Sequence, residues 1–73
     1  MPRKREPSLD NCIKDLRTAE DGMTQQDLAD QIGVTRQTIV ALEGGAYTPS
    51  LALALRISQL FEKSVEEVFW IDE

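Results

Sequence analysis

The residues from Thr24 to Gly45, TQQDLADQIGVTRQTIVALEGG, constrain the fold of this chain more than any other stretch. Leu28 and Ile32 are four residues apart, so they lie on one face of a helix. Ile39 and Leu42 are three residues apart and share a face in the same way. The spacing therefore predicts two short helices joined by a tight turn.

The turn between these helices is predicted from the residues that would end one helix and begin the next. Gly33 can take the left-handed conformation that ends a helix, and Val34 supplies an apolar side chain beneath the turn. The Thr35 hydroxyl can accept a free backbone N–H of the next helix, which Gly44-Gly45 should stop. Ala29 falls where the two backbones must cross closely, because a larger side chain would force them apart.

The segment before this pair predicts a first helix that runs to about Glu20. Asp10 or Asn11 can cap its start, and Asp21-Gly22 should end it. Its apolar face is expected to contain Leu9, Cys12, Ile13 and Leu16. This would give the chain a helix that packs against the central pair.

Capping signals mark the starts of the other helices. Thr24 and Asp27 are spaced as a capping box for the second helix. Ser64 and Glu67 are spaced as a capping box for a short fifth helix, and the closing run VFWIDE fits a helix end or a short strand. Ser50 caps a fourth helix, LALALRISQLF, with an expected apolar side of Leu51, Ala54, Leu55, Ile57, Ser58 and Phe61.

The length of 73 residues allows one small domain, predicted over residues 9–73 and preceded by a flexible basic arm over residues 1–8. The arm contains Arg3, Lys4 and Arg5, two prolines and almost nothing apolar. Two interpretations of the arm stay open. It is either a phosphate-seeking or minor-groove arm, or a disordered terminus that keeps the chain in solution.

Composition excludes several classes of function. The chain has no His, and its single Cys12 excludes a disulfide or a cysteine metal cluster within one chain, so no metal or cofactor is expected. No nucleophile lies beside a base, which argues against an enzyme. No apolar run approaches membrane-spanning length and MPRKREPS lacks the apolar segment of a signal peptide, so a cytoplasmic protein is expected.

The charge balance opposes a simple DNA-binding interpretation. Thirteen acidic residues against eight basic ones give a net charge of −5, whereas a DNA-binding domain usually shows a basic footprint. Net charge is a poor guide where charge is segregated, because much of the acidity can point away from a binding face. The acids gather at Glu20-Asp21, Asp27, Asp30, Glu62, Glu66-Glu67 and Asp72-Glu73.

The central segment resembles the helix-turn-helix of DNA-binding repressors. Counted from Gln25, Ala is fifth, Gly ninth, Val tenth, Ile fifteenth and Leu eighteenth. The run TRQTIVALEGGAYTPSLALALRISQLF, followed by VEEVFW, resembles the Cro/CI-type (XRE-type) regulators, notably the small single-domain subgroup that includes the cytolysin repressor. The resemblance covers about residues 11–70. It implies an all-α, five-helix DNA-binding domain, sometimes with a short antiparallel sheet made by the two termini.

The resemblance also implies which residues meet double-stranded DNA. The third helix would enter the major groove, where Arg36 can donate twice to guanine and Gln37 can pair with adenine. Gln25 suits a phosphate, and Val40 is either a thymine-methyl contact or chance surface apolarity. The predicted DNA-binding set is Thr24, Gln25, Thr35, Arg36, Gln37, Thr38, Val40, Ala41, Tyr47 and Thr48. Ser50 is either a further contact or only a helix cap.

The family pattern implies an ion pair between Arg17 of the first helix and Glu43 of the third, the alternative being that both are solvated. It also implies a homodimer on a palindromic operator, with repression as the expected mode. The expected dimer surface consists of Phe61, Val68, Phe69, Trp70 and Ile71, because the closing run has more apolar residues than a five-residue helix can bury. Under the alternative, Trp70 only completes the monomer core.

Two other functions remain open from the sequence. The domain could be the DNA-binding antitoxin of a toxin–antitoxin pair, with the acidic surface and apolar C-terminal run holding the toxin. It could also be a protein-interaction module that has lost DNA binding, which the acidity allows.

Overall fold

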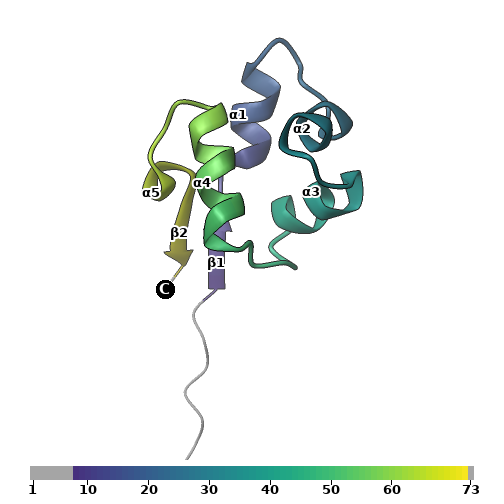
Figure 1. Ribbon diagram of the computed structural model, residues 1–73. Helices are drawn as coiled ribbons and strands as arrows, with labels where there is room; N and C mark the ends of the chain where they lie inside the picture. Colours follow the sequence, from purple (N-terminus) through teal and green to yellow (C-terminus); the bar gives the residue numbers. More distant parts are fainter. Residues whose placement is uncertain (1–7, 73) are drawn as a thin grey trace, which may run out of the picture.

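The computed structural model describes residues 8–72 (Figure 1). Along the chain, one strand precedes five helices and a second strand follows them, in the order β1, α1, α2, α3, α4, α5 and β2. Their bounds are β1 Ser8–Asn11, α1 Ile13–Ala19, α2 Gln25–Ile32, α3 Arg36–Glu43, α4 Leu51–Leu60, α5 Val65–Val68 and β2 Phe69–Asp72. The architecture confirms the predicted five-helix Cro/CI-type fold with a short sheet. Residues 1–7 of the predicted arm lie outside the described residues, and Ser8 belongs to β1.

The two strands join the ends of the described chain (Figure 1). β1 and β2 pair antiparallel, with Ser8 opposite Asp72 and Asn11 opposite Phe69. Of the two structures that VFWIDE allowed, a helix end or a strand, the chain forms the strand from Phe69 onwards. The sheet therefore ties the start of α1 to the end of α5.

The predicted start of the first helix is wrong, because Leu9 and Asp10 pair with β2 as strand residues. Asn11 ends β1, although its Oδ1 still accepts the Ile13 N–H at 3.0 Å at the start of α1. Cys12 occupies the N-cap position and its Sγ lies 3.3 Å from the Glu67 carbonyl oxygen. Partial burial and, second, the nearby Asp15 carboxylate raise the pKa of the Cys12 thiol. Cys12 therefore stays protonated at neutral pH, as a small packing residue should.

The capping signals around α2 and α3 are confirmed. Thr24 Oγ1 accepts the Asp27 N–H at 3.0 Å, and Asp27 Oδ2 accepts the Thr24 N–H at 3.0 Å. Gly33 ends α2 with a φ of 83°, a left-handed value that a side chain would strain. Thr35 Oγ1 accepts the Thr38 N–H at 3.3 Å at the start of α3. These local bonds fix the turn that separates the two helices.

The later helices also start where the sequence predicted. Ser50 Oγ accepts the Leu53 N–H at 3.1 Å, so Ser50 acts as the cap of α4. Ser64 and Glu67 form the predicted capping box of α5, in which Glu67 Oε1 accepts the Ser64 N–H at 2.9 Å. That bond from the Ser64 backbone is the main cause that lowers the pKa of Glu67.

A single apolar core joins all five helices to β2. Ala29 is fully buried, in agreement with its predicted place at the crossing of α2 and α3. The core consists of Ile13, Leu28, Ala29, Ile32, Ile39, Leu42, Leu53, Ala54, Ile57, Phe61, Val68 and Phe69. None of the helices in residues 8–72 is long and apolar enough to cross a membrane.

The predicted apolar side of α4 is partly wrong. Leu51 and Leu55 are 72% and 42% exposed, whereas Leu53, which the prediction omitted, is buried. The buried stripe of α4 consists of Leu53, Ala54, Ile57 and Ser58, and Leu51 and Leu55 lie outside it. An alternating LALAL run is compatible with more than one helical face, so the sequence alone did not select the correct one.

Candidate nucleic-acid interface

The turn between α2 and α3 presents the start of α3 to solvent. Ile39 and Leu42 are buried and hold α3 against the core, while Thr35, Arg36 and Gln37 at its start are exposed. Arg36 carries the only positive side chain of α3. A guanidinium and a primary amide on one exposed helix end are the two groups best suited to reading purine edges in the major groove.

A buried ion pair fixes the other end of α3. Arg17 Nε donates to Glu43 Oε2 at 2.8 Å, and Arg17 Nη2 donates to Glu43 Oε1 at 3.1 Å. Arg17 Nη1 donates to the Met23 carbonyl oxygen at 2.8 Å, so the guanidinium also holds the entrance to α2. Hydrogen bonding to Glu43 raises the pKa of Arg17 above its ordinary value. The predicted pair between α1 and α3 is therefore confirmed.

Gln25 connects this ion pair to the start of α3. Its Nε2 donates to Glu43 Oε1 at 3.1 Å, and its Oε1 accepts a bond from Arg36 Nη1 at 3.2 Å. The sequence pointed only to a phosphate contact for Gln25 and missed both internal bonds. A separation of eleven residues between Gln25 and Arg36 carries no periodic signal, so only the packing of α2 on α3 brings them together.

The other predicted contact residues fall into two groups. Thr24 and Thr35 act as helix caps, and the Thr38 hydroxyl lies 3.1 Å from the Thr35 hydroxyl. The second group lies further along α3 and in the loop that follows it. Within that group, Val40 and Tyr47 are each 44% exposed, Thr48 is exposed and Ala41 is half-buried. Side chains of the second group are free to meet a ligand, although no bond ties them to Arg36.

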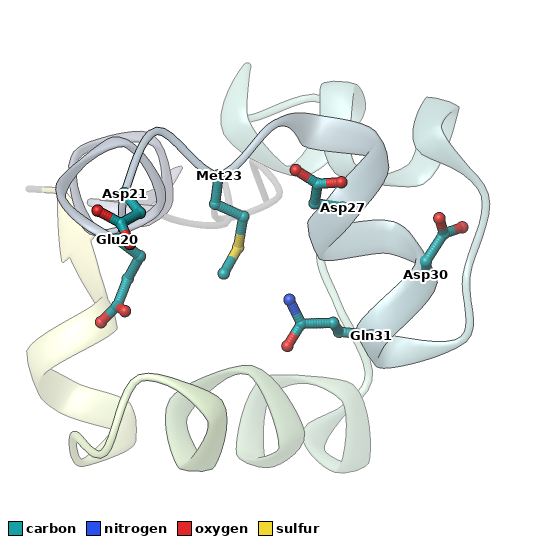
Figure 2. Close-up of a pocket in the computed structure, with 6 residues that line it drawn as sticks. All are labelled: Glu20, Asp21, Met23, Asp27, Asp30 and Gln31. Atoms are coloured by element: carbon teal, nitrogen blue, oxygen red, sulfur yellow. The ribbon is translucent and has the colours of Figure 1, made fainter.

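Some of the acidic side chains cluster away from Gln25. A hollow of about 400 Å³ lies beside the turn between α1 and α2 (Figure 2). Asp27 and Asp30 project from α2 about 160° and about 140° around the helix axis from Gln25. The hollow is lined by Glu20, Asp21, Met23, Asp27, Asp30 and Gln31. Apart from Asp27, whose carboxylate accepts the Thr24 N–H, this arrangement agrees with the expectation that much of the negative charge points away from a phosphate-binding surface, in spite of the net charge of −5.

The predicted dimer surface is smaller than the sequence suggested. Phe61, Val68 and Phe69 are 8%, 0% and 6% exposed within one chain, so they belong to the monomer core. Trp70 and Ile71 are 42% and 48% exposed and remain available. The alternation of side chains in β2 turns Phe69 inward and Trp70 outward, whereas Phe61 and Val68 are buried in the core at the ends of α4 and α5.

The comparisons with known proteins all point to the same protein family. The helix-turn-helix family model matches residues 13–68. The uncharacterized HTH-type transcriptional regulator YgzD of Bacillus subtilis is 48% identical over 89% of this chain and 97% of its own length. An uncharacterized HTH-type transcriptional regulator of Archaeoglobus fulgidus is 49% identical over 84% of each chain.

A solved structure shares the fold. A crystal structure of a protein from Bacteroides fragilis has a TM-score of 0.73 against this chain, covering 85% of this chain and 98% of the other. Its sequence is only 22% identical, so it supports the arrangement of helices and nothing finer.

Proposed function

Because the chain belongs to the XRE-type helix-turn-helix family of transcriptional regulators, we propose that it reads a specific operator in double-stranded DNA with the start of α3. In this proposal Arg36 and Gln37 meet base edges in the major groove. Thr24, Gln25, Tyr47 and Thr48 meet the phosphate backbone on the two sides. The observation that carries the proposal is the exposed guanidinium of Arg36 on a helix whose other face is locked into the core.

The proposal extends to a homodimer that represses transcription from a palindromic operator. One recognition helix reads only a few base pairs, which is too little to define one site in a genome. A two-fold dimer doubles the contact and sets two half-sites about 34 Å apart. The relatives carry the names of transcriptional regulators, so no observation favours the antitoxin alternative.

Selection of bound duplexes from a random pool tests the proposal. The full chain should enrich one motif, arranged as an inverted repeat with half-sites about one helical turn apart. A parallel selection with Arg36→Ala serves as the control, because it removes the cation of α3 and leaves the core unchanged. Failure of the parent chain to enrich any motif at low salt would contradict sequence-specific binding.

The basic arm provides a separate prediction. Three of the eight basic residues, Arg3, Lys4 and Arg5, fall in the first seven positions. Deleting residues 1–6 should weaken operator binding without changing the preferred sequence, because phosphate contacts position the protein and base contacts specify the site. The slope of log affinity against log salt should shrink by up to roughly 3. A slope equal to that of the parent would show that the arm does not contact DNA.

The dimer leads to a prediction at Trp70. Trp70→Ala should give a folded monomer in sedimentation experiments and should bind a palindromic operator far more weakly than the parent. Tyr47→Ala is a matched control for sedimentation, because it removes an aromatic side chain that is 44% exposed against 42% for Trp70. A parent chain that sediments as a monomer at tens of micromolar would contradict the dimer. An unfolded Trp70→Ala variant would support the alternative that Trp70 completes the core.

A further inference from the structure

The terminal sheet has an outer face on which an aromatic ring lies beside two carboxylates. Asp10 of β1 is directly opposite Trp70 of β2, and Asp72 follows Trp70 two residues later. Because opposed residues share a face and side chains alternate along a strand, these three side chains project from the same face. All three are exposed, whereas Phe69 and Leu9 on the other face pack in or against the core. The three exposed residues form the acidic sheet face.

This face suits a positively charged side chain. An indole attracts a cation placed over its ring, and carboxylates beside the ring strengthen that attraction. Asp10 Oδ1 accepts the Asn11 N–H at 2.7 Å, which leaves Oδ2 for a further donor. In the part of the chain that the structure describes, the ion pair joins α1 to α3, so no described cation neutralises Asp10 or Asp72.

The charge of this face matters for the proposed homodimer, which places Trp70 in the contact. In a two-fold contact one patch meets its own copy, so the two aspartates of each chain would bring four carboxylates together. Like charges at short range oppose association, and no described cation offsets them. A dimer that buries this face therefore needs cations inside the contact.

We propose that the basic arm of each protomer supplies these cations to the acidic sheet face of its partner. The inference rests on the proposed homodimer and states what neutralises its contact. Arg3, Lys4 and Arg5 precede β1 in the sequence. Ser8, the first residue of β1, is opposite Asp72, so the arm joins the domain at one end of this face. From Ser8 back to Arg5 the chain can span up to about 10 Å, which is enough to cross to a partner packed on the same face.

The contact also limits how many cations of the arm reach DNA. Arginine and lysine side chains held by carboxylates of the partner are less available to phosphates. Deleting residues 1–6 should therefore reduce the salt slope of operator binding by clearly less than roughly 3, the value for three cations that all contact DNA.

Two neutralised variants test the contact. The arm variant carries Arg3→Gln, Lys4→Gln and Arg5→Gln. The face variant carries Asp10→Asn and Asp72→Asn, of which Asp10→Asn keeps the oxygen that accepts the next backbone N–H. Thermal melting should show that both variants fold, because the substituted side chains are exposed or precede β1.

Sedimentation equilibrium at low salt measures the dimer dissociation constant of each chain. The arm variant should raise this constant about ten- to hundredfold, because two symmetric contacts are lost together. The difference should vanish at about 1 M salt, where charges are screened beyond about 3 Å. In the face variant, the arm substitutions should raise the constant at least about threefold less, because their carboxylate partners are gone. An equal rise in both backgrounds, or no rise in either, would overturn the proposal.

A matched control removes the same charge elsewhere. Glu20→Gln with Asp21→Asn neutralises two exposed carboxylates at the turn after α1, at the opposite end of α1 from the sheet (Figure 1). In this control chain the arm substitutions should weaken the dimer as much as they do in the parent. A reduced effect there would show that the arm responds only to total charge, which also contradicts the proposal.

Mixing the variants decides whether the arm reaches its own chain or the partner. When the arm variant is mixed with the face variant, only a mixed dimer unites a basic arm with an intact acidic sheet face on the other chain. Native mass spectrometry should therefore show more mixed dimer than random pairing gives. The arm variant mixed with the control chain has the same net charges and should show no such excess. Equal pairing in the two mixtures would overturn the exchange between protomers. A parent chain that stays monomeric at tens of micromolar would instead remove the dimer itself, which is a different result from a dimer that ignores the arm.

Discussion

Arg36→Ala and Gln37→Ala should each abolish most of the operator preference and leave the fold intact. Both side chains are exposed at the start of α3, and neither is part of the core. A bidentate contact to a base carries about 1–3 kcal/mol of discrimination, which corresponds to about 5- to 150-fold in preference. Competition binding against a base-substituted operator at matched salt measures this loss, and thermal melting reports the fold.

Two exposed residues of α4 provide matched controls. Arg56→Ala removes the same charge as Arg36→Ala, and Gln59→Ala removes the same amide as Gln37→Ala, each at an exposed position. Any general loss of positive charge should weaken binding in both arginine variants alike, whereas base recognition should be lost only with Arg36. Parent-like discrimination by both α3 variants would show that the assignment of α3 as the reading helix is wrong.

The sequence predicted best those features that depend on neighbouring residues. Thr24, Gly33 and Thr35 specify the starts and end of helices through bonds to residues one to four positions away, and all three act as predicted. The two central helices followed from the same local signals combined with the spacing of Leu28 and Ile32 and of Ile39 and Leu42, whereas the five-helix fold class came from the family resemblance. Periodicity and capping are readable because each involves only a few consecutive residues.

Features that depend on distant pairing were missed or only half predicted. β1 exists because residues 8–11 meet residues 69–72, and nothing within LDN alone distinguishes a strand from a helix start. The same pairing buries Phe69 and exposes Trp70, which reduced the predicted dimer surface. The contact of Gln25 with Arg36 depends on how α2 crosses α3, so no local pattern contains it. The Arg17–Glu43 pair was predicted only through the family resemblance.

The largest effect on stability is expected at Arg17. Its side chain is 10% exposed and that of Glu43 is 8% exposed, so the ion pair lies inside the protein between α1 and α3. Arg17→Met leaves the Glu43 carboxylate without its cation and removes the donor to the Met23 carbonyl. Removing one partner of a buried pair costs about 3–5 kcal/mol, because the remaining charge is left uncompensated. That is a large fraction of the roughly 5–15 kcal/mol that holds a small domain together.

Urea unfolding at one fixed protein concentration measures this loss, since dimerisation makes stability depend on concentration. The double variant Arg17→Met with Glu43→Met should recover much of the lost free energy of unfolding, because two apolar side chains of similar length leave no buried charge. Arg56→Met is the matched control and should stay within about 0.5 kcal/mol of the parent, as expected for an exposed position. If Arg17→Met were as stable as the parent, the pair would contribute no net stability. The anchoring of α3 would then have to come from other contacts, such as the burial of Ile39 and Leu42 and the bond from Asn11 Nδ2 to the Leu42 carbonyl oxygen.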